Sequence, residues 1–206
     1  MNLSKDIILN KLRKIQGEEL FIHSKATSRM AICLAENLIK KNPSLKINIK
    51  KIETASLLHD WAKGFSKNKL INLAKKYSLN IDNYESKNPG LLHGPVGAAV
   101  LENELGVKDK IILKAVKNHT TGNSKMSVFD KIIFVADHIE VNRNYHMVDE
   151  IRSIALTDFN QAVIMVIENK IFYVLKKRVL LHPKTISAWN AVIKSNRPII
   201  NGSRRL

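Results

Sequence analysis

The segment "LLHDWAKG", residues 57–64, ends an apolar run with a histidine beside an aspartate. Buried charges destabilise a fold unless they are paired or bind a metal. Imidazole nitrogen with carboxylate oxygen suits iron, manganese or zinc, whereas a chain with one cysteine offers no thiolate site. We therefore regard the residues of these types at the ends or inner faces of predicted helices as candidate metal ligands: His23, His59, Asp60, His93, His119 and Asp137.

Asp137 supports this interpretation independently, because it follows the apolar run "IIFVA", residues 132–136. An unpaired carboxylate there would become protonated or would destabilise the fold by several kcal/mol. Two explanations remain open, a bound metal or an ion pair with Arg143 or a lysine. Each histidine taken alone is more often a hydrogen-bonded core residue, so the argument depends on the set.

A pair of metal ions at this set would make it catalytic. A carboxylate such as that of Asp60 has two oxygens and can bridge two ions. Ions about 3.5–4 Å apart can share a hydroxide that attacks phosphorus in line. We therefore predict two metal ions, and the donor set leaves iron, manganese and zinc open.

Cationic side chains near the aspartates would bind the charge that grows on phosphate oxygens. Lys63 lies three residues after Asp60, and Arg143 follows Asp137 by about a turn. We assign Lys63 and Arg143 to catalysis and to phosphate binding. The alternatives are a solvated lysine at position 63, and an ion pair of Arg143 with Asp137 or Glu140.

The turn after His119 offers a second kind of phosphate contact. Thr120, Thr121 and Gly122 provide hydroxyl and backbone N–H groups, which bind phosphate oxygens well. The alternative is that these three residues only form the turn.

The elements that must position these residues are predicted to be helices, because no alternating strand pattern competes with helical spacing. Ligands so far apart in sequence can meet only if helices converge in a bundle. The clearest loop is 83–90, Ser127 is predicted to cap a helix, and Cys33 is predicted to be a buried core residue. The helices are expected over 22–41, 52–62, 66–78, 92–105, 108–118, 128–140, 148–178 and 182–195.

Length and composition set the class of protein. A chain of 206 residues with 45% hydrophobic and 25% charged residues suits one globular domain. Its apolar runs are too short to span a membrane, and its N-terminal residues lack a signal-peptide core. We therefore expect a cytoplasmic protein without a membrane partner. No G-x-G-x-x-G or G-K-[ST] motif is present, which disfavours Rossmann and P-loop nucleotide binding.

The formal net charge of +16 raises the question of a nucleic-acid partner. Lysines make up 26 of the 34 basic residues and are scattered along the chain, which favours a solvated surface. Nucleic acid is thus disfavoured but not excluded as a partner. The corresponding alternative function is a non-enzymatic, basic, RNA-associated helical protein with a structural metal.

Four segments together resemble a known family. The order H…HD…D is typical of HD-domain metal-dependent phosphohydrolases. "LLHDWAKG", "LLHGPVGA", "NHTTGNSKMSVFDKIIFVADHIEVNR" and "HPKTISAWN" are similar in order and spacing to the YqeK group of bacterial HD proteins, from about residue 20 to 190. The resemblance implies a single all-α HD-type helical bundle over 1–198, with a metal-binding core at about 20–143, a helical extension at about 144–198 and a tail at 199–206.

The resemblance also implies a function and a ligand set. The YqeK group is a group of symmetrical bis(5′-nucleosyl)-tetraphosphatases, which cut diadenosine tetraphosphate into two ADP with a di-iron centre. Carried over, the metal ligands are the six residues named above, and Asp60 bridges the two ions. Another nucleotide as substrate of an HD phosphohydrolase or phosphodiesterase is the enzymatic alternative. A homodimer is compatible with the sequence.

Overall fold

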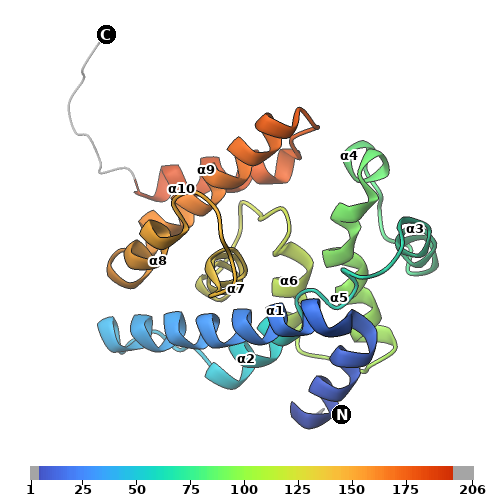
Figure 1. Ribbon diagram of the computed structural model, residues 1–206, viewed down its shortest axis with the longest axis horizontal. Coiled ribbons are helices and arrows are strands. Elements are labelled where there is room, and N and C mark those ends of the chain that lie inside the picture. The colour runs from blue at the N-terminus through green and yellow to red at the C-terminus, as the bar shows by residue number, and fades with distance from the viewer. Residues whose placement is uncertain (1–4, 197–206) are drawn as a thin grey trace.

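The computed structural model describes residues 5–196, and within that range the chain is helical and contains no β-strand. The all-α prediction is therefore confirmed (Figure 1). None of the helices in this range has both the length and the apolar character needed to cross a bilayer. The elements are, in order, α1 (Lys5–Lys41), α2 (Ile49–Leu58), α3 (Lys67–Lys76), α4 (Asn83–Lys87), the 3₁₀ helix η1 (Pro89–Leu92), α5 (His93–Asn103), α6 (Lys110–Asn118), α7 (Val128–Ile139), α8 (Val148–Thr157), α9 (Phe159–Lys177) and α10 (Pro183–Asn196).

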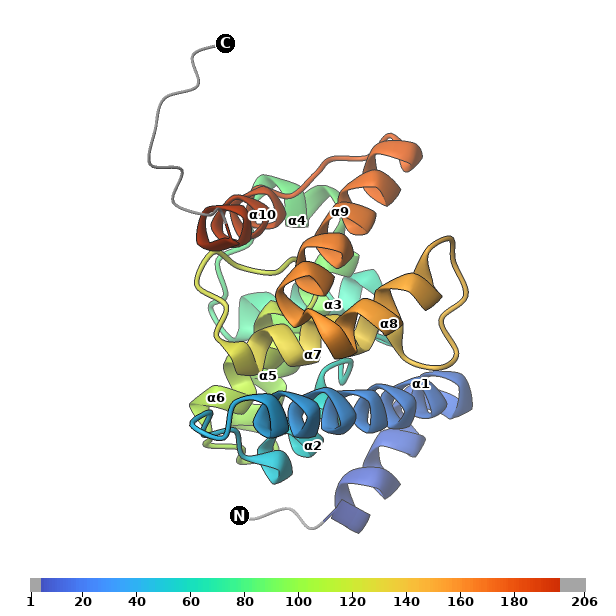
Figure 2. The same ribbon diagram turned by 90° about the vertical axis from the view of Figure 1, so that its left-hand side faces the viewer.

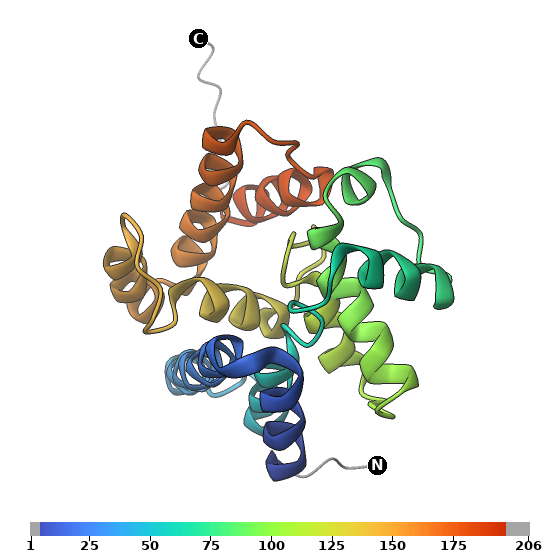
Figure 3. The same ribbon diagram turned by 45° about the vertical axis from the view of Figure 1, so that its right-hand side comes forward.

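Helix α7 lies at the centre of the molecule. Figures 2 and 3 show α1 and α2 on one side of it and α9 and α10 on the other. Residues 132–136 of α7 are all buried, as expected for a helix that is apolar on every side. Ser127 begins this helix in a reciprocal capping box with Asp130, so the predicted cap is confirmed.

Helix α1 is longer than predicted and is bent at Gly17. Its backbone there has φ 74° and ψ 175°, a conformation that side chains with a Cβ rarely adopt. The bend folds residues 5–16 back against the body of the molecule, where Leu12 is fully buried. The prediction began this helix at residue 22, so residues 5–21 of α1 were missed.

Three other sequence predictions were wrong. The expected loop 83–90 contains α4 and η1, since Asp82 caps α4 in a capping box with Glu85. The expected single helix 148–178 is two helices, because Asp158 is non-helical and caps α9. Cys33 is exposed rather than buried. In each case tertiary packing or a cap decided what helical spacing alone could not.

Helix α9 packs on α8, α10 and α7, and α8 also packs on α7 and α1. The division into a core at 20–143 and an extension at 144–198 stays a prediction. The predicted tail, 199–206, lies outside the described residues.

Candidate metal centre

The six predicted ligands lie together at the meeting point of five helices. They form two groups, each with one ligand atom per residue within 4.8 Å of the others. Asp60 belongs to both groups. We call the six residues the central cluster: His23 on α1, His59 and Asp60 at the end of α2, His93 at the start of α5, His119 at the end of α6 and Asp137 on α7.

The two carboxylate oxygens of Asp60 face different groups of histidines. Oδ1 is 3.2 Å from Nε2 of both His93 and His119. Oδ2 is 3.4 Å from His59 Nε2 and 3.6 Å from His23 Nε2. A carboxylate placed in this way has one oxygen available for each of two cations.

Asp137 completes the second group. Its Oδ1 lies 3.0 Å from His23 Nε2 and 3.6 Å from His59 Nε2. One group thus has two imidazoles and two carboxylates, and the other has two imidazoles and the shared carboxylate of Asp60.

Backbone carbonyl groups determine which nitrogen of three histidines carries the proton. In each, Nδ1 approaches the carbonyl oxygen three residues earlier, which can only accept a hydrogen bond. In the neutral ring the proton is therefore on Nδ1, which leaves Nε2 with a lone pair directed toward the cluster. The contacts are His59 to Ser56 at 2.7 Å, His93 to Gly90 at 2.5 Å and His119 to Val116 at 2.7 Å.

His23 is oriented by a carboxylate instead. Its Nδ1 lies 3.2 Å from Oε1 of the buried Glu140. Carboxylates that accept from a ligating histidine fix its ring and raise its basicity. Sequence reasoning considered Glu140 only as a partner of Arg143 and missed this role.

The donor set and its spacing fit metal ions. Ligand atoms about 2.1 Å from a cation, at angles between 90° and tetrahedral, are separated by about 3.0–3.4 Å. His93 Nε2 and His119 Nε2 are 3.0 Å apart, and neither carries a proton to donate to the other. His59 Nε2 is buried without a hydrogen-bond partner. A cation in each group would satisfy these nitrogens.

The electrostatics of the cluster keep both aspartates ionised. Although burial opposes ionisation, the adjacent imidazole of His59 and the contact with His119 hold the pKa of Asp60 well below its usual value. Burial likewise opposes ionisation of Asp137, and its contacts with His23 and His59 lower its pKa. The cluster therefore presents two carboxylate charges toward its centre.

The two histidines that face Asp60 Oδ1 meet because of one glycine. A Cβ at Gly94 would lie 2.9 Å from Lys117 O and 3.1 Å from Thr120 Oγ1. The start of α5 can approach the end of α6 this closely only without a side chain at position 94.

Lys63 and Arg143 both lie at the edge of the cluster. Lys63 Nζ is 3.7 Å from Asp60 Oδ1, with about half of the side chain exposed. Arg143 Nη2 is 2.6 Å from Asp137 Oδ1, so the ion pair named as an alternative is present. Both side chains, with His23, line a small surface pocket of about 270 Å³. Their assignment to phosphate stays a prediction.

The three residues of the predicted phosphate-binding turn have different surroundings. Thr120 Oγ1 lies 3.0 Å from His93 Nε2 and 3.3 Å from His119 Nε2. Thr121 is buried, and its carbonyl accepts a hydrogen bond from Thr185 of α10. Gly122 packs against Ala188 of α10. For Thr121 and Gly122 these contacts match the alternative of a plain turn.

Lys170 of α9 is a cation that sequence reasoning missed. Its Nζ lies 3.2 Å from Nε2 of His138, whose Nδ1 contacts Phe134 O. Burial lowers the pKa of Lys170 to about 8, a shift that Asp137 opposes and that Lys63 and Arg143 reinforce. The sequence held one sign that Lys170 is half-buried. It lies on the same helix face as the apolar residues Val163 and Ile167, which precede it at helical spacing.

A third group of histidine and carboxylates lies between α4 and α10. We call it the peripheral cluster: Asp82, Glu85 and His182. His182 Nδ1 accepts a hydrogen bond from the backbone N–H of Lys184, at the start of α10. Its Nε2 lies 3.1 Å from Asp82 Oδ2, although no well-aligned hydrogen bond joins the two.

Comparison with known proteins places the chain in a family. The family model described as HD domain matches residues 20–142, which include all six residues of the central cluster. The chain belongs to the HD domain family. The chain also matches curated relatives over most of its length, as the resemblance to the YqeK group implied.

Two curated relatives carry the same name, "Bis(5′-nucleosyl)-tetraphosphatase, symmetrical". The one from Bacillus subtilis is 35% identical over 179 residues, which cover 87% of this HD-domain chain and 92% of the relative. The one from Staphylococcus aureus is 32% identical over 190 residues, which cover 88% and 93%.

A solved structure has the same fold. It is the crystal structure of a predicted HD superfamily hydrolase involved in NAD metabolism from Clostridium acetobutylicum. The TM-score is 0.87 at 33% identity, and the match covers 94% of this chain and 98% of that one. The HD-domain bundle, including α8–α10, is therefore shared with that protein.

Proposed function

We propose that this HD-domain protein is a metal-dependent hydrolase that cleaves diadenosine tetraphosphate symmetrically into two ADP. The observation that carries the proposal is the central cluster, with Asp60 shared between two groups of ligand atoms. The substrate is inferred from the relatives, which bear the name of this activity and match over more than nine-tenths of their length.

The chain's own residues would hold two metal ions through imidazole Nε2 atoms and the carboxylates of Asp60 and Asp137. When bound, such ions supply Lewis acidity and lower the pKa of a water to near neutrality. The proposal takes iron as the metal, with manganese, zinc and magnesium as alternatives. It also takes the protein to act in the cytoplasm.

Three cations surround the position that phosphate would occupy. Lys63 lies beside Asp60, and Arg143 lies beside Asp137. Lys170 approaches from α9, held by His138. Hydrolysis of a phosphate anhydride builds negative charge on the leaving and non-bridging oxygens, which these side chains would stabilise. Thr120, with its hydroxyl at the nitrogens of His93 and His119, is the fourth proposed contact.

The test is product stoichiometry with diadenosine tetraphosphate, measured on the metal-loaded protein. Two ADP per substrate are expected. ATP with AMP would show asymmetric cleavage and would overturn the proposed function. Release of inorganic phosphate from mononucleotides, with the dinucleotide left intact, would favour the alternative of a different nucleotide substrate.

A further inference from the structure

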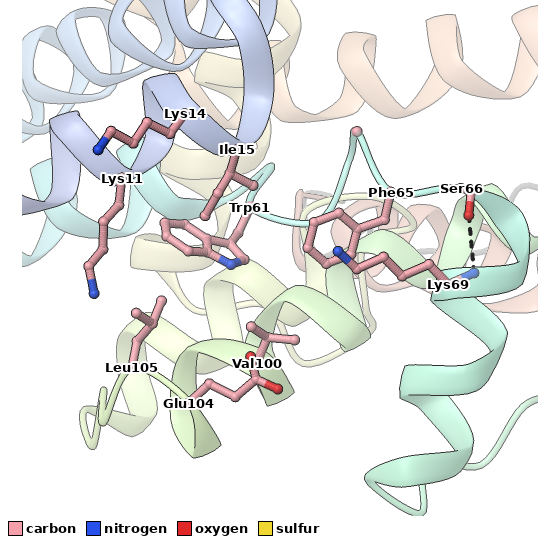
Figure 4. Close-up of a pocket in the computed structure, with 11 residues that line it drawn as sticks. Lys11, Lys14, Ile15, Trp61, Phe65, Ser66, Lys69, Val100, Glu104 and Leu105 are labelled. Carbon is pink, nitrogen blue, oxygen red and sulfur yellow. Dashed lines mark hydrogen bonds between the residues drawn. The ribbon is translucent and has the colours of Figure 1, made fainter.

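A groove whose lining shares no residue with the central cluster has the features of an anion-binding site. It encloses about 660 Å³ between the N-terminal part of α1, the segment after Asp60, the start of α3 and the end of α5 (Figure 4). Ligand pockets for small molecules have about this size. None of the residues that line the groove belongs to the central cluster. Lys63, Arg143 and Lys170 do not line the groove either.

Three lysines give the groove its charge. Lys11 and Lys14 project from α1, and Lys69 projects from α3 on the other side (Figure 4). No carboxylate among the described side chains, 7–196, pairs with Lys11 or Lys14. Glu104 is the single acidic residue of the lining, and its charge is already bound by Lys76 at 3.0 Å and by the Tyr77 hydroxyl.

Trp61 adds a hydrogen-bond donor. Its side chain lines the groove, yet the residue is only 3% exposed. Among the described residues no acceptor takes a hydrogen bond from its indole Nε1. The nitrogen therefore has a free N–H, and an acceptor group on a ligand in the groove could take its hydrogen bond.

The start of α3 favours an anion as well. Ser66 caps this helix by accepting from Lys69 N, and no acidic residue occupies the first turn. The partial positive charge of a helix N-terminus is therefore not neutralised there.

The rest of the lining is apolar. Ile15, Val100 and Leu105 contribute aliphatic surface, and Phe65 contributes a ring with Lys69 Nζ 3.7 Å above its centre. An inorganic anion would leave this surface in water. A ligand with both phosphates and a flat, weakly polar base would cover it.

We propose that this groove is a second binding site, which takes a nucleoside polyphosphate. The phosphates would lie against Lys11, Lys14 and Lys69, and the nucleoside would cover the apolar wall beside Trp61. This site is separate from the metal centre, so the proposal does not depend on which substrate that centre hydrolyses.

The test uses Trp61 as the reporter, because Trp61 and Trp189 are the only two tryptophans of the chain. In the Trp189→Phe background, ADP is titrated into the full-length, metal-loaded protein and Trp61 emission is recorded. A saturable change is expected. Lys11→Glu with Lys14→Glu should weaken ADP binding by about tenfold or more, since two charge-assisted contacts are reversed.

The matched control is Lys40→Glu with Lys125→Glu, which makes the same charge change at two exposed positions outside the groove. It should shift ADP binding by less than about twofold, because neither lysine lines the groove. If circular dichroism shows that the Lys11→Glu, Lys14→Glu variant does not fold, Lys69→Glu provides a second groove variant.

Three outcomes would overturn the proposal. The first is equal ADP binding by the groove and control variants. The second is inorganic tripolyphosphate binding as tightly as ADP, because the nucleoside would then contribute nothing. The third is a change in Trp61 emission with single-stranded RNA but not with ADP.

Discussion

The central and peripheral clusters use the same residue types but differ in the contact that each histidine makes with the backbone. In the central cluster, Nδ1 of His59, His93 and His119 contacts a carbonyl oxygen, so Nε2 presents a lone pair. In the peripheral cluster, His182 Nδ1 accepts from a backbone N–H, so its Nε2 carries the proton and faces Asp82.

The carboxylates differ in the same sense. Asp82 and Glu85 are engaged in the capping box of α4, and Glu85 also contacts Lys184 Nζ at 3.2 Å. Asp60 faces four imidazole nitrogens with both oxygens. The comparison teaches that proximity of histidine and aspartate does not by itself make a metal site. The backbone contact that sets the tautomer decides whether the cluster offers lone pairs or hydrogen bonds.

Asp60→Asn should have the largest effect, because it removes the charge shared by both groups of ligand atoms while keeping the side chain's shape. We expect loss of bound metal and a fall in kcat/KM of more than about 100-fold, the upper range for loss of a residue that only supports a metal ligand. Metal analysis and turnover measure this. Asp82→Asn, in the peripheral cluster, is the matched control. Normal metal content and activity in Asp60→Asn would show that the central cluster is not a metal site.

Glu140→Gln tests whether the carboxylate that contacts His23 Nδ1 contributes to metal affinity, as the backbone carbonyls at Nδ1 of the other three histidines are expected to do. We expect metal affinity to fall by about 10–100-fold, because His23 loses a charged partner that fixes its ring. Competition with a chelator gives the affinity. An unchanged value would show that His23 is held by packing alone.

Lys170→Met tests the contribution of α9 to the centre. Removing one charge-assisted phosphate contact should lower kcat/KM by about tenfold, with bound metal unchanged. The exposed Lys176→Met on the same helix is the control, and it should be neutral. A loss of metal with Lys170→Met would assign this lysine to the structure of the cluster rather than to phosphate.

The pKa of Lys170 also predicts a pH dependence. Burial lowers that pKa to about 8, so the ammonium is present below pH 8 and is lost as the pH rises above it. Activity of the wild type should therefore decline by several-fold between about pH 8 and pH 9.5. Lys170→Arg, whose guanidinium stays charged over this range, should decline less. Parallel pH profiles for the two proteins would contradict the role of Lys170.

Asp82→Ala should have the smallest effect on chemistry and a measurable one on stability. Loss of the cap of α4 and of the contact with His182 should cost about 1 kcal/mol, or about 2–4 °C in Tm for a chain of this size. Metal content and kcat/KM should not change. A loss of bound metal would show that the peripheral cluster also binds a cation.

Much of the local structure could be read from the sequence because helices depend on neighbours within about four residues. Ser127 signalled the start of α7, and residues 132–136 signalled its burial. The same locality explains the errors. The helical pattern showed neither the extension of α1 before residue 22 nor the break at Asp158, because a bend in one helix and a break between two look alike in a periodic pattern.

The sequence by itself determined which residue types were available for a metal and that helices would carry them. The tertiary structure alone decided that six residues spread over 115 positions meet, that Glu140 and Lys170 join them, and that His182 does not. The physical reason is that a tautomer and a ligand distance depend on packing between helices, such as the approach of α5 to α6 at Gly94, which helical spacing does not encode.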